Sequence, residues 1–109
     1  MKIFLDNSDV DVVKYHCQTG LIDGVTTNPT LMMQAGRNPV KVISEISSLF
    51  TAVGSISAEV VADTAEEMVL QSEQYHSISD NVTIKVPCTY EGLKACKTLS
   101  DRNIKVNVT

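Results

Sequence analysis

The sequence predicts an α/β fold: parallel β-strands with helical crossovers, corresponding to the first five strands of a TIM-type (β/α)8 barrel. Short β-rich segments alternate with helical patterns over all 109 residues, as in right-handed β-α-β crossovers. Each expected strand has one apolar face and one face with polar residues near its carboxyl end. No repeat, low-complexity stretch or linker interrupts the pattern. We therefore predict a single partial barrel domain over residues 1–109.

The expected elements follow one another in a regular order. The strands are short runs rich in β-branched residues, over residues 2–6, 23–28, 55–61, 81–86 and 104–109. The helices show apolar residues at helical spacing, between Ser8 and Gly20, from Pro29 to residue 33, over 40–52, from Thr64 to His76 and over 90–100. Gly54 and Pro87 are typical of breaks between elements.

Two of these helices begin with a specific signal. Ser8-Asp9-Val10-Asp11 and Thr64-Ala65-Glu66-Glu67 place a hydroxyl three residues before a carboxylate. This is the spacing of a capping box, in which the hydroxyl accepts a hydrogen bond from a backbone N–H of the first turn. The sequence therefore predicts that Ser8 and Thr64 cap the two helices.

Two architectures fit the alternation: an open doubly wound sheet or part of a barrel. Helices cover both faces of a doubly wound sheet, so both faces should be apolar. In a barrel one face points into the lumen, and polar groups at the carboxyl ends of the strands build the site. In the fourth strand Val82, Ile84 and Val86 oppose Thr83 and Lys85. This alternation favours the barrel.

In a barrel, polar side chains from all five strands would surround one opening. They are Asp6, Thr26, Asn28, Glu59, Lys85, Asn107 and Thr109. One such residue would mean little, but a set drawn from every strand indicates a functional site. Each also has a structural interpretation when taken alone. Asp6 could cap the following helix, Glu59 could be a solvated strand end, and Asn28-Pro29 is a common turn.

Lys85 is the most informative member of this set, because it lies in the apolar run of residues 82–86. A lysine in such a run must reach water, pair with a carboxylate, or be kept neutral by burial. A neutral amine attacks carbonyls and can form a Schiff base. The alternative is an edge-strand lysine whose ammonium group extends to solvent.

The chemistry of the other members suits a ketose phosphate bound to that amine. Asp6 could exchange a proton with a substrate hydroxyl, and Glu59 with the water released during dehydration. The uncharged members could orient hydroxyls and relay hydrogen bonds: Thr26, Asn28, Asn107 and Thr109.

Composition excludes several other classes of function. The net charge is −4, the pI is near 5.0, and no basic cluster is present, which argues against nucleic-acid binding. No apolar run approaches the length of a membrane span, and the acidic residue at position 6 argues against a signal peptide. The three cysteines lack metal-type spacing, so we predict no metal, reduced thiols and a cytoplasmic protein.

Five segments resemble the successive strand motifs of the transaldolase family, above all of its small, microbial-type subfamily. They are Phe4-Leu5-Asp6, Gly24-Val25-Thr26-Thr27-Asn28-Pro29-Thr30, Ser57-Ala58-Glu59-Val60, Ile84-Lys85-Val86-Pro87 and Asn107-Val108-Thr109. The resemblance implies a (β/α)8 aldolase of the pentose phosphate pathway, without a cofactor, that transfers a dihydroxyacetone unit between sugar phosphates. It also implies that Lys85 is the Schiff-base lysine and that Asp6 and Glu59 move protons. By the same likeness the four uncharged residues position substrate and the catalytic water.

The family also contains fructose-6-phosphate aldolases, and the resemblance implies a glutamine there at the position of Glu59. The glutamate of this chain therefore favours a transaldolase, with the aldolase as the alternative.

The resemblance covers only the N-terminal half of the family's barrel, whose later strands supply a phosphate-binding arginine and a site serine. Arg37 is expected to be a loop residue and not a replacement for that arginine. We therefore expect a truncated chain whose activity depends on the missing strands. The alternative from another class is a non-catalytic half-barrel or assembly module. Exposed strand edges lead us to expect a homo-oligomer that covers them.

Overall fold

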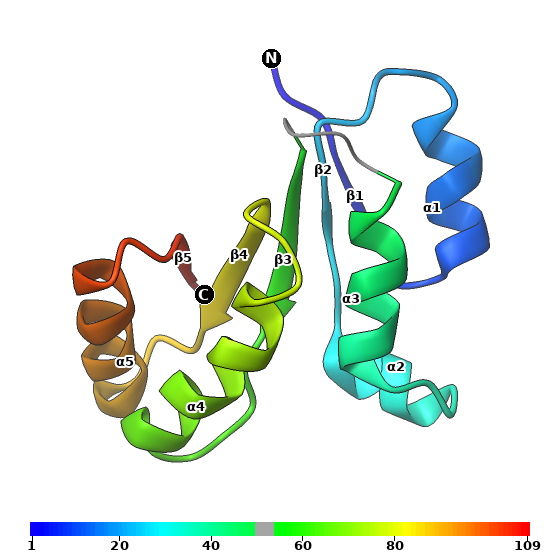
Figure 1. Ribbon diagram of the computed structural model, residues 1–109. Coiled ribbons are helices and arrows are strands. Elements are labelled where there is room, and N and C mark those ends of the chain that lie inside the picture. The colour runs from blue at the N-terminus through cyan, green and yellow to red at the C-terminus, as the bar shows by residue number, and fades with distance from the viewer. Residues whose placement is uncertain (50–53) are drawn as a thin grey trace.

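The computed structural model describes residues 1–49 and 54–109. The strands are β1 (Phe4–Asp6), β2 (Gly24–Thr26), β3 (Ser55–Glu59), β4 (Val82–Val86) and β5 (Val106–Val108). The helices are α1 (Val10–Cys17), α2 (Pro29–Gln34), α3 (Pro39–Ser47), α4 (Ala65–His76) and α5 (Tyr90–Asp101) (Figure 1).

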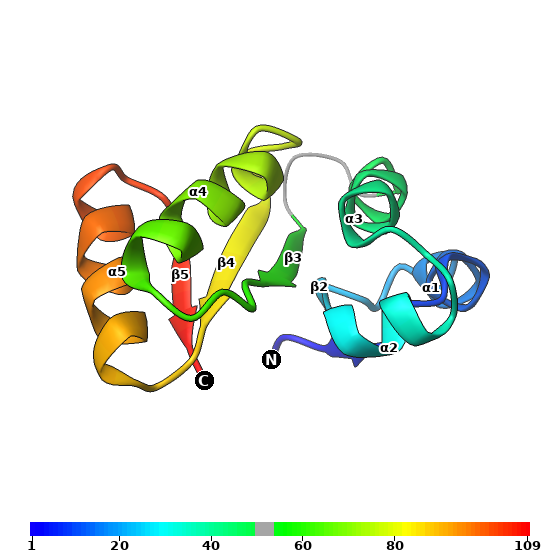
Figure 2. The ribbon, with the colours of Figure 1, turned by 90° about the horizontal axis from the view of Figure 1, so that it is seen from below.

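The strands form one parallel sheet in the order β1-β2-β3-β4-β5, the order in which they occur in the sequence. The strand order of a doubly wound sheet reverses at a switch point, whereas a barrel adds each strand next to the previous one. Viewed from below, the strands follow an arc, with α1, α3, α4 and α5 on its outer side (Figure 2). The predicted fold class, the first five strands of a (β/α)8 barrel, is confirmed.

The core lies between the sheet and these outer helices. The sheet contributes Val25, Ile56, Ala58, Val82, Ile84 and Val86, and the helices contribute Val13, Ile43, Ile46, Met68 and Leu99, all at most 2% exposed. Burying one such aliphatic side chain stabilises a fold by roughly 1.5–3 kcal/mol. Because the apolar residues alternate along each strand, packing fixes which face is covered and leaves the polar face on the inside of the arc.

The prediction that Thr64 caps α4 is confirmed, and the prediction that Ser8 caps α1 is wrong. The Thr64 hydroxyl accepts a hydrogen bond from the Glu67 backbone N–H at 3.2 Å. The N-cap of α1 is Asp9, whose Oδ1 accepts from the N–H groups of Asp11 at 2.9 Å and Val12 at 3.2 Å. A carboxylate at a helix N-terminus also interacts favourably with the helix dipole, which a hydroxyl cannot do. The Ser8 hydroxyl is therefore available for another contact.

Element ends differ from the prediction mainly in the strands. β2 ends at Thr26 and not at residue 28, because Asn28 is already the N-cap of α2. The helix predicted over 40–52 ends at Ser47, and its expected residues 50–52 lie outside the described residues. No helix in the described part of the chain is long and apolar enough to cross a membrane.

Candidate active site

Two of the predicted site residues, Asp6 and Thr26, are in direct contact on the inner face of the arc. They are register partners at the carboxyl ends of β1 and β2. The Thr26 hydroxyl donates a hydrogen bond to Asp6 Oδ1 at 2.9 Å. Asp6 Oδ1 is the acceptor in this bond, and Asp6 Oδ2 takes no part in it.

Three more predicted residues form a row across the next strands. Glu59 on β3 is the register partner of Lys85 on β4, and Lys85 is the register partner of Asn107 on β5. Neighbouring parallel strands lie about 4.8 Å apart, and register partners point to the same face. Within residues 1–49 and 54–109, no ion pair joins Lys85 to a carboxylate. The row therefore brings an amine, a carboxylate and an amide together.

The edge-strand alternative for Lys85 is wrong. β4 lies between β3 and β5, so Lys85 is on an interior strand, and the residue is half-buried. Its chain neighbours Ile84 and Val86 are fully buried on the opposite face.

The strand register shows that the Asp6–Thr26 pair and the row of Glu59, Lys85 and Asn107 lie on the same face of the sheet. Thr26 pairs with Ser57, and Ser57 pairs with Thr83. Ser57 and Thr83 precede Glu59 and Lys85 by two residues, so they share their face. Ser57 is only 3% exposed, and the Thr83 hydroxyl lies 3.1 Å from the Ser55 hydroxyl. The layer beneath the lysine is therefore built from hydroxyl groups.

Asn28 and Thr109 lie just past the ends of β2 and β5. Asn28 Oδ1 accepts a hydrogen bond from the Leu31 N–H at 3.2 Å, so Asn28 is the N-cap of α2 and Asn28-Pro29 starts a helix instead of the turn that its structural interpretation predicted. The Thr109 backbone continues the β4–β5 pairing: its N–H donates to the Val86 carbonyl at 2.9 Å, and its carbonyl accepts from the Cys88 N–H at 2.7 Å. Both residues follow strands that carry other members of the predicted site.

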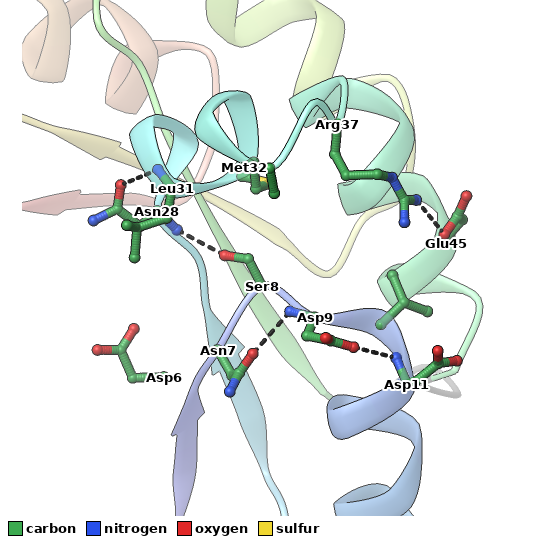
Figure 3. A pocket seen from close by; sticks show the side chains of 12 residues that line it. Asp6, Asn7, Ser8, Asp9, Asp11, Asn28, Leu31, Met32, Arg37 and Glu45 are labelled. Carbon is green, nitrogen blue, oxygen red and sulfur yellow. Dashed lines mark hydrogen bonds and ion pairs between the residues drawn. The ribbon is translucent and has the colours of Figure 1, made fainter.

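A cavity of about 530 Å³ lies between the β1–α1 loop, α2 and α3 (Figure 3), and its lining includes Asp6 and Asn28 but not Glu59 or Lys85. Asp6 and Asn28 line one side of it, and Arg37 and Glu45 line another (Figure 3). As expected, Arg37 lies in a loop, and its guanidinium pairs with Glu45 at 2.8 Å. This arginine therefore forms a partly exposed ion pair on the cavity wall. In the described residues, no group of three or more histidine, cysteine or carboxylate side chains could hold a metal ion.

Sequence reasoning missed one contact in this region. The Ser8 hydroxyl accepts a hydrogen bond from the Asn28 N–H at 3.0 Å. The capping-box motif drew attention to Ser8 for another reason, and nothing in the sequence signals a contact over 20 residues.

Fold and candidate site together define one class of protein, the N-terminal half of a parallel α/β barrel with a lysine and two carboxylates at the carboxyl ends of its strands. The family model for transaldolase/fructose-6-phosphate aldolase matches residues 3–109. This chain therefore belongs to that family.

Its curated relatives include three bacterial proteins named "Probable transaldolase". Identity is 47% with the one from Ruegeria sp. (strain TM1040), 48% with the one from Caulobacter vibrioides and 45% with the one from Roseobacter denitrificans. Each match spans all 109 residues of this chain and 49% of the relative. The chain thus spans about half the length of these relatives.

Proposed function

We propose that this chain carries the Schiff-base half of a transaldolase active site, which transfers a dihydroxyacetone unit from a ketose phosphate to an aldose phosphate. The observation that carries the proposal is the row of Glu59, Lys85 and Asn107 on the inner face of the sheet. Family membership and the relatives' names support the same chemistry.

The first half of the proposed reaction joins Lys85 to the substrate. The neutral Nζ attacks the ketone carbon and a C–N bond forms. The nitrogen then loses a proton and the former carbonyl oxygen gains one, which gives a carbinolamine. The hydroxyl of this intermediate leaves as water after accepting a proton, and an iminium remains. Glu59 supplies that proton, because its carboxyl group is in register with the lysine.

The second half breaks the bond between the carbon attached to the iminium carbon and the next carbon along the sugar chain. The electron pair of that bond moves into the iminium and gives an enamine, while the hydroxyl proton of the departing fragment passes to Asp6. An aldose phosphate leaves, and the reverse sequence on a second aldose completes the transfer. Asp6 suits this role because Thr26 orients its carboxylate, while Asn28, Asn107 and Thr109 position the hydroxyls.

The test is borohydride trapping of the 109-residue chain with fructose 6-phosphate, read by intact mass and peptide mapping. We expect a reduced adduct on Lys85 that is lost in Lys85→Ala. Lys105→Ala is the matched control, since Lys105 precedes β5 at the opposite end of the sheet. A folded chain without an adduct would refute the proposal and favour a non-catalytic half-barrel.

A second candidate is a fructose-6-phosphate aldolase, because the family model covers both activities. The two differ in the fate of the enamine. An aldolase releases free dihydroxyacetone from fructose 6-phosphate alone, whereas a transaldolase needs an aldose acceptor. Release without an acceptor would therefore identify the aldolase.

We also propose a cytoplasmic location and a homo-oligomer. The cysteines at positions 17, 88 and 96 are all free, which agrees with a reducing compartment. β1 and β5 are the edge strands of the described sheet, and Ile3, Phe4 and Val108 on or beside them are 39–46% exposed. A second copy could cover these edges.

A further inference from the structure

The loops that follow β1 and β2 are joined by one side chain. The pairing of the two strands continues to Asn7, whose N–H donates to the Thr26 carbonyl at 3.1 Å. The next contact is made by the half-buried Ser8, whose hydroxyl accepts from the Asn28 N–H at 3.0 Å (Figure 3). Because Asp9 caps α1, the Ser8 hydroxyl is not needed at that helix.

Asn28 is consequently held at two points. Ser8 holds its backbone N–H, and its Oδ1 accepts from the Leu31 N–H at 3.2 Å. These bonds leave the Nδ2 group of Asn28 as the donor for a ligand. On the neighbouring strand, Asp6 Oδ1 accepts from Thr26, so Oδ2 is the acceptor left for a ligand. Asp6 and Asn28 lie on the same side of the cavity in Figure 3. Such a donor and acceptor together suit a hydroxyl group.

We propose that Ser8 is a positioning residue, which fixes Asn28 for recognition of a hydroxyl of the sugar phosphate. The inference rests on the proposed function for its ligand and on the Ser8–Asn28 bond for its mechanism. Without the Ser8 hydroxyl, the β2–α2 loop loses its bond to the β1–α1 loop. The distance between the Asn28 amide and the Asp6 carboxylate is then less restricted. A ketone without hydroxyls would not respond to this change.

The test compares Ser8→Ala, which removes the hydroxyl, with Ser8→Thr, which keeps it. Ser100→Ala on the exposed side of α5 is the matched control. Borohydride trapping at Lys85 is measured over a range of fructose 6-phosphate concentrations and with acetone, a ketone that carries no hydroxyl. Hydrogen exchange of the Asn28 backbone amide is measured by NMR on the same proteins without ligand.

We expect Ser8→Ala to raise the half-saturating concentration of fructose 6-phosphate roughly three- to tenfold, the effect of one lost hydrogen bond. Trapping by acetone should stay within about twofold, because it needs Lys85 and no hydroxyl contact. The Asn28 amide should exchange faster in Ser8→Ala, and Ser8→Thr should restore both measurements.

Two results would overturn the inference: unchanged exchange of the Asn28 amide in Ser8→Ala, or equal losses with fructose 6-phosphate and acetone. Trapping by acetone but not by fructose 6-phosphate in the unmodified chain would instead refute the proposed function. The exchange measurement would still decide whether Ser8 holds Asn28.

Discussion

Thr26 donates its side-chain hydroxyl to Asp6 Oδ1 over 2.9 Å, across the two strands that begin the sheet. We propose Asp6 as a proton carrier, and the sequence predicts that Thr26 positions the substrate. The bond places these two residues in direct contact. Thr26 is half-buried and Asp6 is exposed, so the bond orients a group that still meets solvent or substrate.

Thr26→Val should therefore impair the cleavage step through Asp6. Valine keeps the shape and removes the donor, so we expect cleavage of fructose 6-phosphate to slow by roughly three- to tenfold. Thr26→Ser should retain most of the rate. Enamine formation followed in single-turnover experiments would measure this, and equal rates for Val and Ser would show that the hydroxyl has no such role.

The two carboxylates should act at different steps. The glutamine in Glu59→Gln cannot donate the proton for dehydration. The rate at which the iminium at Lys85 forms and is trapped should therefore fall by roughly 10²- to 10⁴-fold, the usual range for general acid catalysis. Asp6→Asn should slow carbon–carbon cleavage more than iminium formation. Rapid trapping in Glu59→Gln, or equal losses at both steps in Asp6→Asn, would refute the respective assignment.

The molecular mass in solution should show whether a second copy covers the exposed edge strands. If a second copy covers β1 or β5, light scattering coupled to size exclusion should give at least twice the mass of 11.9 kDa. Val108→Lys would place a charge on the edge strand β5 and should shift the protein towards monomer. A monomer at all concentrations would refute the homo-oligomer.

Stability should depend on pH through Glu91, which joins α5 to α4. The N–H of Ala65 donates to its carboxylate at 3.0 Å, and Lys94 lies nearby; both hold the pKa of Glu91 below its ordinary value of 4.5. The ionised form is thus favoured in the folded state. Its stabilising effect is present above pH 4.5 and is lost as the pH falls through the lower folded pKa.

We expect Glu91→Gln to melt at a lower temperature than the unmodified chain near pH 6, with the difference disappearing on acidification. Circular dichroism melts between pH 6 and pH 3 would show this. A difference that grows as the pH falls would contradict the assignment.

Gly92 should tolerate no side chain at the start of α5. A Cβ at this position would collide with the carbonyl oxygen of Pro87, two residues after Lys85. Gly92→Ala should lower the free energy of unfolding by about 1–3 kcal/mol, as overpacking does. Denaturant unfolding would measure this, with Ser100→Ala in the same helix as the control. A change below 0.5 kcal/mol would contradict the expected collision.

The sequence by itself determined the fold class and the face of the sheet on which the candidate site residues lie. Alternation of Val82, Ile84 and Val86 with Thr83 and Lys85 is a local property with period two, so it predicts which side chains meet the helices. The choice of barrel over doubly wound sheet followed from the same alternation, and the strand order confirms it.

Only the tertiary structure decided which residues meet. Glu59 and Lys85 are register partners although they are 26 residues apart in the sequence. Hydrogen bonds connect Thr26 with Asp6 and Asn28 with Ser8, in each case across 20 residues of sequence. Local patterns cannot specify such pairs, because register depends on how whole strands and helices pack. The competition between Ser8 and Asp9 for the start of α1 shows the same limit. Both residues cap helices well; Asp9 caps α1, and Ser8 accepts a hydrogen bond from Asn28 in the neighbouring loop.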